Sequence, residues 1–172
     1  MTSWLGMQLV HESGHVLGAL ATGGRVTHVE LKPWTISRTD VEPNPHPLVE
    51  RWSGPIIGSV LPLAGWGIAS RLRQSWAYLL RFFAGFCLIA NGAYLGVGAF
   101  WPVGDAADIL RVEPSHWPLV VFGTAAAAGG FALWHRLGPA FGLGPAGQGV
   151  NRRDIVAVWC VAGVIIGIET MM

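Results

Sequence analysis

The first apolar stretch of the chain carries an ionisable motif at its centre. The stretch runs from about Ser3 to Thr22, and His11-Glu12-Ser13-Gly14-His15 lies in its middle. On a helix, residues four apart share one face, so the two imidazoles would lie one above the other. This is the spacing at which two histidines bind one zinc ion, with the Glu beside the first acting as general base. Because ionisable side chains are costly in an apolar segment, the motif predicts a functional site rather than a packing feature.

The composition indicates what surrounds this motif. Of 172 residues, 52% are hydrophobic and only 12% are charged, whereas a soluble domain has about 25% charged residues. The mean hydropathy is +0.46. We therefore expect a multi-pass integral membrane protein of the cell membrane, with the lipid bilayer as its environment. The net charge of +1 gives no reason to expect a nucleic-acid partner.

Five apolar stretches indicate the fold class. Their approximate limits are residues 3–22, 54–70, 82–101, 117–134 and 155–168. A bilayer-spanning helix needs about 20 residues, which the second and fifth stretches reach only with flanking residues. We predict an all-α polytopic membrane protein with about five transmembrane helices, in which residues 1–172 form a single domain. Pairs of glycines four apart within the stretches predict close helix packing.

A polar insert, residues 23–51, separates the first two stretches. Gly23-Gly24 is expected to end the first helix. Residues 25–31 alternate in polarity and residues 35–41 are rich in strand formers, with a turn expected at residues 32–34. The pattern therefore predicts a small β-hairpin. An exposed edge of this hairpin would be able to pair with an extended peptide.

Two histidines require a third protein ligand to hold a metal. In the longer zinc-protease pattern a third His follows six residues after the second, but position 21 is Ala. The glutamates of the insert and of the last stretch are poorly placed. Asp105 and Asp108, directly after the third stretch, remain the best candidates, and the one that is not a ligand would orient a ligand or cap a helix.

These features together resemble the site-2 protease family of intramembrane zinc metalloproteases. The shared features are HESGH in a first membrane helix, a following β-hairpin, Ser53-Gly54-Pro55 opening the second helix, and residues 105–110. The last of these, Asp-Ala-Ala-Asp-Ile-Leu, is similar to the family's Asp-Gly-Gly-x-Ile-Leu. The chain departs from the family at Gly104, where the family has Leu, and at Gly58, where the family's Gly-Pro-x-x-Asn ends in Asn.

The resemblance extends over about residues 5–110. It implies a metalloprotease-like core at residues 1–112 that includes the hairpin insert. Residues 113–172 would then contribute additional helices outside the family pattern. The implied partners are the lipid bilayer and a membrane protein or peptide that serves as substrate.

The resemblance also implies roles for particular residues. A Zn²⁺ ion would be held by His11, His15 and Asp105, with a zinc-bound water as nucleophile and Glu12 as general base. Asn91, in the middle of the third stretch, would donate a hydrogen bond to the developing oxyanion, or else join helices as a polar contact. The implied function is an intramembrane zinc metalloendopeptidase that cleaves a peptide bond in or near the membrane segment of its substrate. The alternatives are a non-catalytic membrane protein of the same fold that binds metal or substrate without cleavage, and a metal transporter.

Overall fold

The structure is a computed structural model that describes residues 1–32, 37–147 and 149–171. Within them the chain forms six α-helices, one short 3₁₀ helix and a two-stranded antiparallel hairpin. In chain order these are α1 (Thr2–Ala21), β1 (Val26–Glu30), β2 (Arg38–Val41), α2 (Pro47–Arg71), α3 (Ala77–Gly98), α4 (Gly104–Val112), α5 (Trp117–Trp134), η1 (Gly138–Phe141) and α6 (Arg152–Met171).

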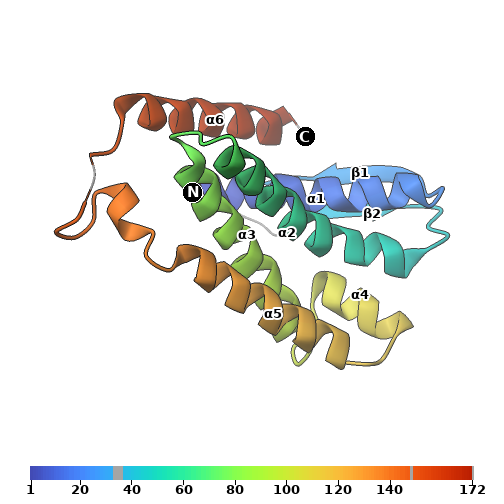
Figure 1. Cartoon of the computed structure of the whole chain (residues 1–172). Helices are drawn as coiled ribbons and strands as arrows, with labels where there is room; N and C mark the ends of the chain where they lie inside the picture. The colour runs from blue at the N-terminus through green and yellow to red at the C-terminus, as the bar shows by residue number, and fades with distance from the viewer. Residues whose placement is uncertain (33–36, 148, 172) are drawn as a thin grey trace.

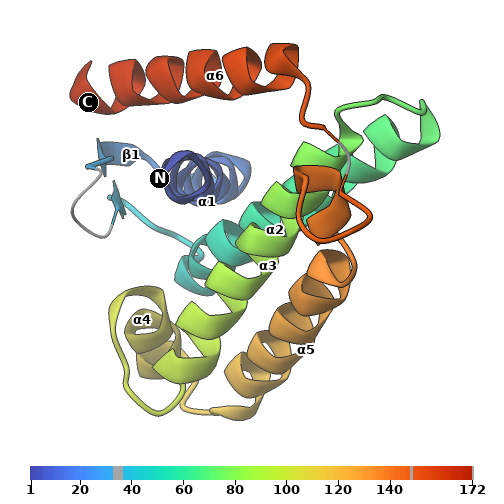
Figure 2. The same ribbon diagram turned by 90° about the vertical axis from the view of Figure 1, so that its left-hand side faces the viewer.

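The helices are arranged so that α2 contacts both α1 and α3 (Figures 1 and 2). Helix α5 packs against α3, and α6 lies along α1 on the side away from α2. The hairpin and α4 lie at the same end of the molecule, where α1 ends and α2 begins (Figure 1). Segments far apart in the sequence are thereby brought together at this end.

The predicted helical fold and the hairpin after the first helix are confirmed. Helix α1 ends where Gly23-Gly24 predicted, because Gly23 adopts the left-handed conformation (φ +78°) and the Gly24 N–H donates to the Ala19 carbonyl at 2.8 Å. In the hairpin, Val29 pairs with Thr39 and Glu30 with Arg38. The predicted turn at residues 32–34 lies for the most part outside the described residues.

The expectation of five spans is met only in part. Among the described residues, two helices, α3 and α5, are long and apolar enough to cross a membrane by length and composition. Helices α1, α2 and α6 are of sufficient length but do not pass the same test. In α1 the reason is plain, because His11, Glu12 and His15 lower the apolar character of the segment.

Two element boundaries differ from the sequence-based expectation. Helix α2 begins at Pro47, so Ser53-Gly54-Pro55 lies inside this helix rather than opening it. Proline is favourable at the first helical position, where its missing N–H is not needed. Residues 104–112, expected as a connection, form helix α4. A cluster of buried residues anchors α4 to α3 and α5: Leu95, Ala99, Ala106, Ile109 and Leu119.

Helices α3 and α5 approach each other through glycines. A Cβ atom added to Gly123 would lie 2.5 Å from the Gly96 Cα and 2.8 Å from the Gly92 carbonyl oxygen. Small residues at such a contact let two backbones come close, as in membrane helix pairs. Only 33% of the most apolar 18-residue stretch of α3, and 22% of that of α5, is buried inside the protein.

Candidate metal centre

Three side chains from two distant segments meet at the hairpin end of the molecule. His11 and His15 lie one turn apart on α1, and Asp105 lies in the first turn of α4. All three are buried, and one potential ligand atom from each lies within 4.8 Å of the other two. Among the described residues, this is the group of His, Cys, Asp and Glu side chains that could hold a metal ion.

The distances within this group suit a metal ion. His11 Nε2 lies 3.0 Å from Asp105 Oδ2, His15 Nε2 lies 3.2 Å from the same oxygen, and the two Nε2 atoms are 3.1 Å apart. A tetrahedral zinc ion with bonds of about 2.1 Å has ligand atoms roughly 3.4 Å apart. The three atoms therefore need to move by only a few tenths of an ångström to bind such an ion.

Asn91 holds the His11 ring in the orientation that metal binding requires. His11 Nδ1 lies 2.7 Å from Asn91 Oδ1, so an Nδ1–H can donate to it and leave the Nε2 lone pair directed toward Asp105. The Asn91 amide N–H donates to the Cys87 carbonyl at 2.9 Å. Both ends of the amide are thus engaged within the protein. The predicted role of Asn91 as an oxyanion donor stays a prediction.

His15 is held in the same manner by the start of α2. Its Nδ1 lies 2.9 Å from the Glu50 carbonyl oxygen and 3.0 Å from the Glu50 carboxylate Oε1. Its Nε2 sits directly over Gly54, where an added Cβ atom would lie 2.2 Å away. A side chain at position 54 would therefore displace the ligating nitrogen, which explains why glycine occupies this position.

Asp105 is anchored through its carboxylate and its backbone. Arg51 Nη1 lies 3.5 Å from Oδ1, the oxygen that does not face the histidines. The Asp105 N–H donates to the Tyr94 hydroxyl at 3.0 Å. Burial opposes ionisation of the carboxyl, but the contacts with His11 and His15 outweigh it, so the pKa of Asp105 lies below its usual value.

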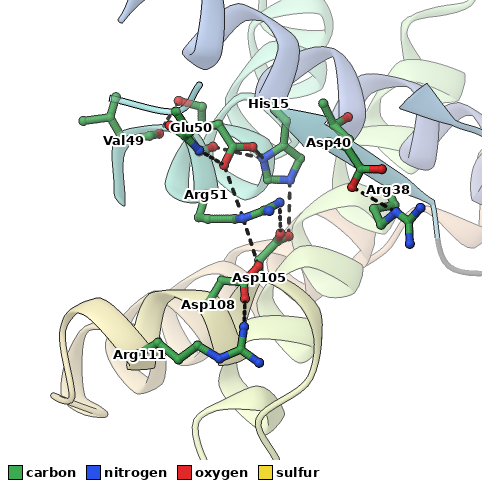
Figure 3. Close-up of polar contacts among 12 residues, drawn as sticks. His15, Arg38, Asp40, Val49, Glu50, Arg51, Asp105, Asp108 and Arg111 are labelled. Carbon is green, nitrogen blue, oxygen red and sulfur yellow. Dashed lines mark hydrogen bonds and ion pairs between the residues drawn. The ribbon is translucent and has the colours of Figure 1, made fainter. Parts of the chain in front are cut away.

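The structure separates the two aspartates that the sequence left as alternatives. Asp108 is not part of the ligand group. Its carboxylate instead pairs with Arg51, at 3.0 Å from Nε, and with Arg111 (Figure 3). Asp108 thus ties α4 to α2, one turn away from Asp105.

Glu12 lies on the same cavity as the ligand group. The cavity has a volume of about 620 Å³ and is lined by His11, Glu12, His15 and Asp105 together with residues of α3 and β2. Glu12 is only 3% exposed, and Thr39 Oγ1 of β2 donates a 2.6 Å hydrogen bond to its Oε2. The hairpin therefore contacts the predicted general base directly.

The charges around the site favour a cation. Four carboxylates gather there: Glu12, Glu50, Asp105 and Asp108. Two guanidinium groups, Arg51 and Arg111, pair with them. If both histidines are neutral, as metal binding requires, two negative charges are left for a divalent ion to balance. Arg38 also lines the cavity, but it pairs with Asp40 at 3.1 Å and adds no net charge (Figure 3).

Sequence reasoning missed four residues that hold the site together: Thr39, Glu50, Arg51 and Tyr94. Glu50 and Arg51 were assigned to the polar insert, but they belong to the first turns of α2. Their adjacency, an acid and a base directly before an apolar helix, was the available signal. Thr39 and Tyr94 carried no such signal, because their contacts depend on packing between distant segments.

Comparison of this chain with protein-family models, with curated proteins and with solved structures found no match.

Proposed function

We propose that this protein is an intramembrane zinc metallopeptidase that resembles the site-2 protease family. The observation that carries the proposal is the convergence of His11 Nε2, His15 Nε2 and Asp105 Oδ2 on one point, with Glu12 on the same cavity. Two imidazoles and one carboxylate are a typical catalytic zinc set, since they leave a fourth position for water or substrate. A structural zinc site would use four protein ligands, and no fourth joins this group among the described residues.

The residues of the site have different roles in the proposed reaction. His11, His15 and Asp105 would hold a zinc ion, which would supply Lewis acidity for the scissile carbonyl and for a water. Glu12 accepts the proton of the attacking water and delivers it to the leaving amine. Thr39 holds the Glu12 carboxylate through Oε2, which leaves the other oxygen available for this exchange.

The membrane setting is supported by the surface of α3 and α5. In the most apolar 18-residue stretch of each helix, only 33% in α3 and 22% in α5 is buried inside the protein. A soluble protein rarely exposes apolar patches of this extent, whereas lipid contact favours them. We infer that α1, α2 and α6 cross the same bilayer beside α3 and α5. The polar residues of α1 then face the cavity rather than lipid.

The hairpin supports the proposed substrate, an extended peptide. A helical membrane segment hides its carbonyls in internal hydrogen bonds, so it must unwind before cleavage. Arg38 and Thr39 of β2 line the cavity, and in the described sheet each strand is paired on one side only. A substrate strand added to this sheet would lie beside Glu12 and the metal ligands.

Two of the departures from the family pattern, at Gly58 and Gly104, have physical explanations in this chain. A Cβ atom added to Gly58 would lie 3.0 Å from the Asn91 amide nitrogen, so Asn91 of α3 occupies space that a longer side chain at position 58 would need. A Cβ atom added to Gly104 would lie 2.0 Å from the Tyr94 hydroxyl. The hydroxyl that holds Asp105 therefore excludes a leucine at position 104.

The test compares wild type with Glu12→Gln in detergent or proteoliposomes. The probe is a panel of synthetic membrane-spanning peptides with a helix-breaking Gly-Pro pair near one end. We expect wild type to hold one zinc and to cut at least one peptide, and Glu12→Gln to keep zinc and lose about 10²–10⁴-fold in cleavage rate. Equal cleavage by both proteins would contradict the proposed mechanism. Zinc binding with no cleavage of any peptide would favour the non-catalytic alternative.

A further inference from the structure

The first turns of α2 place an acid and a base against different members of the ligand group. Glu50 is 0% exposed and lies beside His15 of α1. Arg51, its neighbour, reaches Asp105 of α4 (Figure 3). We propose that Glu50 and Arg51 are positioning residues of the metal centre: Glu50 orients and polarises His15, and Arg51 holds the Asp105 carboxylate so that a single oxygen faces the metal. This inference rests on the proposed zinc site.

The burial of Glu50 is difficult to explain by stability alone. A fully buried carboxylate loses its hydration, and a buried ion pair can often be replaced as a whole by apolar side chains without loss of stability. Its Oε2 contacts Arg51 Nε at 3.2 Å and the Asn44 amide at 3.3 Å. Its Oε1 accepts no aligned hydrogen bond from the described residues, yet it lies 3.0 Å from His15 Nδ1. The carboxylate thus places a negative charge beside the ring without being needed as a hydrogen-bond partner there.

That position has a chemical consequence for His15. Its Nδ1 lies 2.9 Å from the Glu50 carbonyl oxygen, so an Nδ1–H can donate to that oxygen and leave Nε2 free to bind a metal. The nearby carboxylate increases electron density on the ring and so strengthens Nε2 as a metal donor. Among the described residues, the partner of His11 Nδ1 is instead the neutral Asn91 amide, at 2.7 Å. The two histidines are therefore expected to differ as donors.

Arg51 acts on the third ligand from the same turn of helix. Its Nη1 contacts Asp105 Oδ1 at 3.5 Å, and its Nε contacts Asp108 Oδ2 at 3.0 Å. The guanidinium thereby holds α4 at two points one turn apart, and it occupies the Asp105 oxygen that faces away from the histidines. A lysine has one compact charge and cannot make both of these contacts at once. Arg51 thus favours one-oxygen binding by Asp105, which keeps a coordination position open.

The test measures metal binding rather than proteolysis. Metal-free wild type, Glu50→Gln, Arg51→Lys and Arg71→Lys would each be titrated with Co²⁺ in competition with a chelator, and the visible spectrum of the bound ion would be recorded. Arg71 is the matched control, because it lies exposed at the other end of α2. We expect Glu50→Gln and Arg51→Lys each to weaken Co²⁺ affinity about 10–100-fold and to change the spectrum, with Arg71→Lys like wild type.

The outcomes separate this inference from the proposed function. Wild-type affinity and spectrum in both Glu50→Gln and Arg51→Lys would overturn the positioning roles while leaving the zinc site intact. Absence of Co²⁺ binding by wild type would overturn the zinc site and this inference together. Weaker binding with an unchanged spectrum would indicate general destabilisation and would also count against positioning. If circular dichroism shows that Glu50→Gln does not fold, the titration of Arg51→Lys, a change at a partly exposed residue, tests the inference by itself.

Discussion

The metal centre and the α3–α5 pair are held together in different ways. In the metal centre each side chain is fixed by a directed polar contact: His11 by Asn91, His15 by Glu50 and Asp105 by Arg51. In the α3–α5 pair glycine backbones touch along the helices, and hydrogen bonds are made where α3 begins and α5 ends, from Arg81 to the Leu133 carbonyl at 2.7 Å and from Trp134 to the Phe82 carbonyl at 2.9 Å. In the metal centre the polar contacts set the orientation of the potential ligand atoms. At the glycine contact the small size of the residues sets the distance between the two helices.

Helix α3 belongs to both regions and shows the difference within a single element. Asn91 and Tyr94 contact the metal centre, while Gly92 and Gly96 contact α5. The contrast predicts that substitutions toward the site change metal binding or chemistry, and that substitutions toward α5 change stability alone.

The largest effect is expected from Asp105→Ala. Loss of a direct ligand should weaken zinc affinity by more than the roughly 10–100-fold typical of residues behind the ligands. Zinc per protein after dialysis against a chelator measures this loss. Asp108→Ala is the comparison, since Asp108 pairs with Arg51 and Arg111 outside the ligand group, so its loss should weaken zinc affinity less than the loss of Asp105. Retention of zinc by Asp105→Ala would remove the third ligand from the proposed site.

Gly54→Ala should have the next largest effect on metal binding. The new methyl group would lie 2.2 Å from His15 Nε2, so the ring must move away from its ligating position. We expect zinc affinity to fall about 10–100-fold, as for other losses of ligand orientation. Gly67→Ala on the same helix meets no atom within 4 Å and serves as control. Equal affinities for the two variants would mean that His15 is not a ligand in this orientation.

Thr39→Val should lower the cleavage rate without changing metal binding. It removes the hydroxyl that donates to Glu12 Oε2 at 2.6 Å and keeps nearly the same shape. A hydrogen bond to a charged group contributes about 1.5–3 kcal/mol, so a cleavage rate lower by roughly tenfold or more is expected with unchanged zinc content. Thr39→Ser, which keeps the hydroxyl, should recover most of the rate. A rate that is the same in Val and Ser variants would show that Thr39 only fills space.

Gly123→Ala should have the smallest effect on the site and acts on the other region. Its methyl group would meet the Gly96 Cα at 2.5 Å, and overpacking of this kind costs about 1–3 kcal/mol. Thermal unfolding in detergent should shift downward while zinc affinity stays at the wild-type value. Gly129→Ala on the same helix has its nearest contact at 3.9 Å and should be close to neutral. A parallel loss of zinc affinity in Gly123→Ala would show that the two regions are coupled.

Elements whose limits are set by residues close by in the sequence were predictable from the sequence. The apolar run Trp117–Trp134 coincides with α5, and Gly23-Gly24 marks the end of α1. The start of α2 was misjudged because Pro47 was assigned to the polar insert, although proline is favourable at the first turn of a helix. That shift moved Glu50 and Arg51 out of the insert and onto the helix beside His15.

The sequence by itself determined the pairing of His11 with His15, because a spacing of four residues on any α-helix places two rings on the same face. It also determined the helical fold and the hairpin after the first helix. The resemblance favoured Asp105 over Asp108, but only the tertiary structure placed Asp105 beside both histidines and assigned Asn91, Glu50 and Arg51 to their partners. The physical reason is that these choices depend on how α2 and α4 pack against α1, and contacts between segments more than thirty residues apart leave no local pattern in the chain.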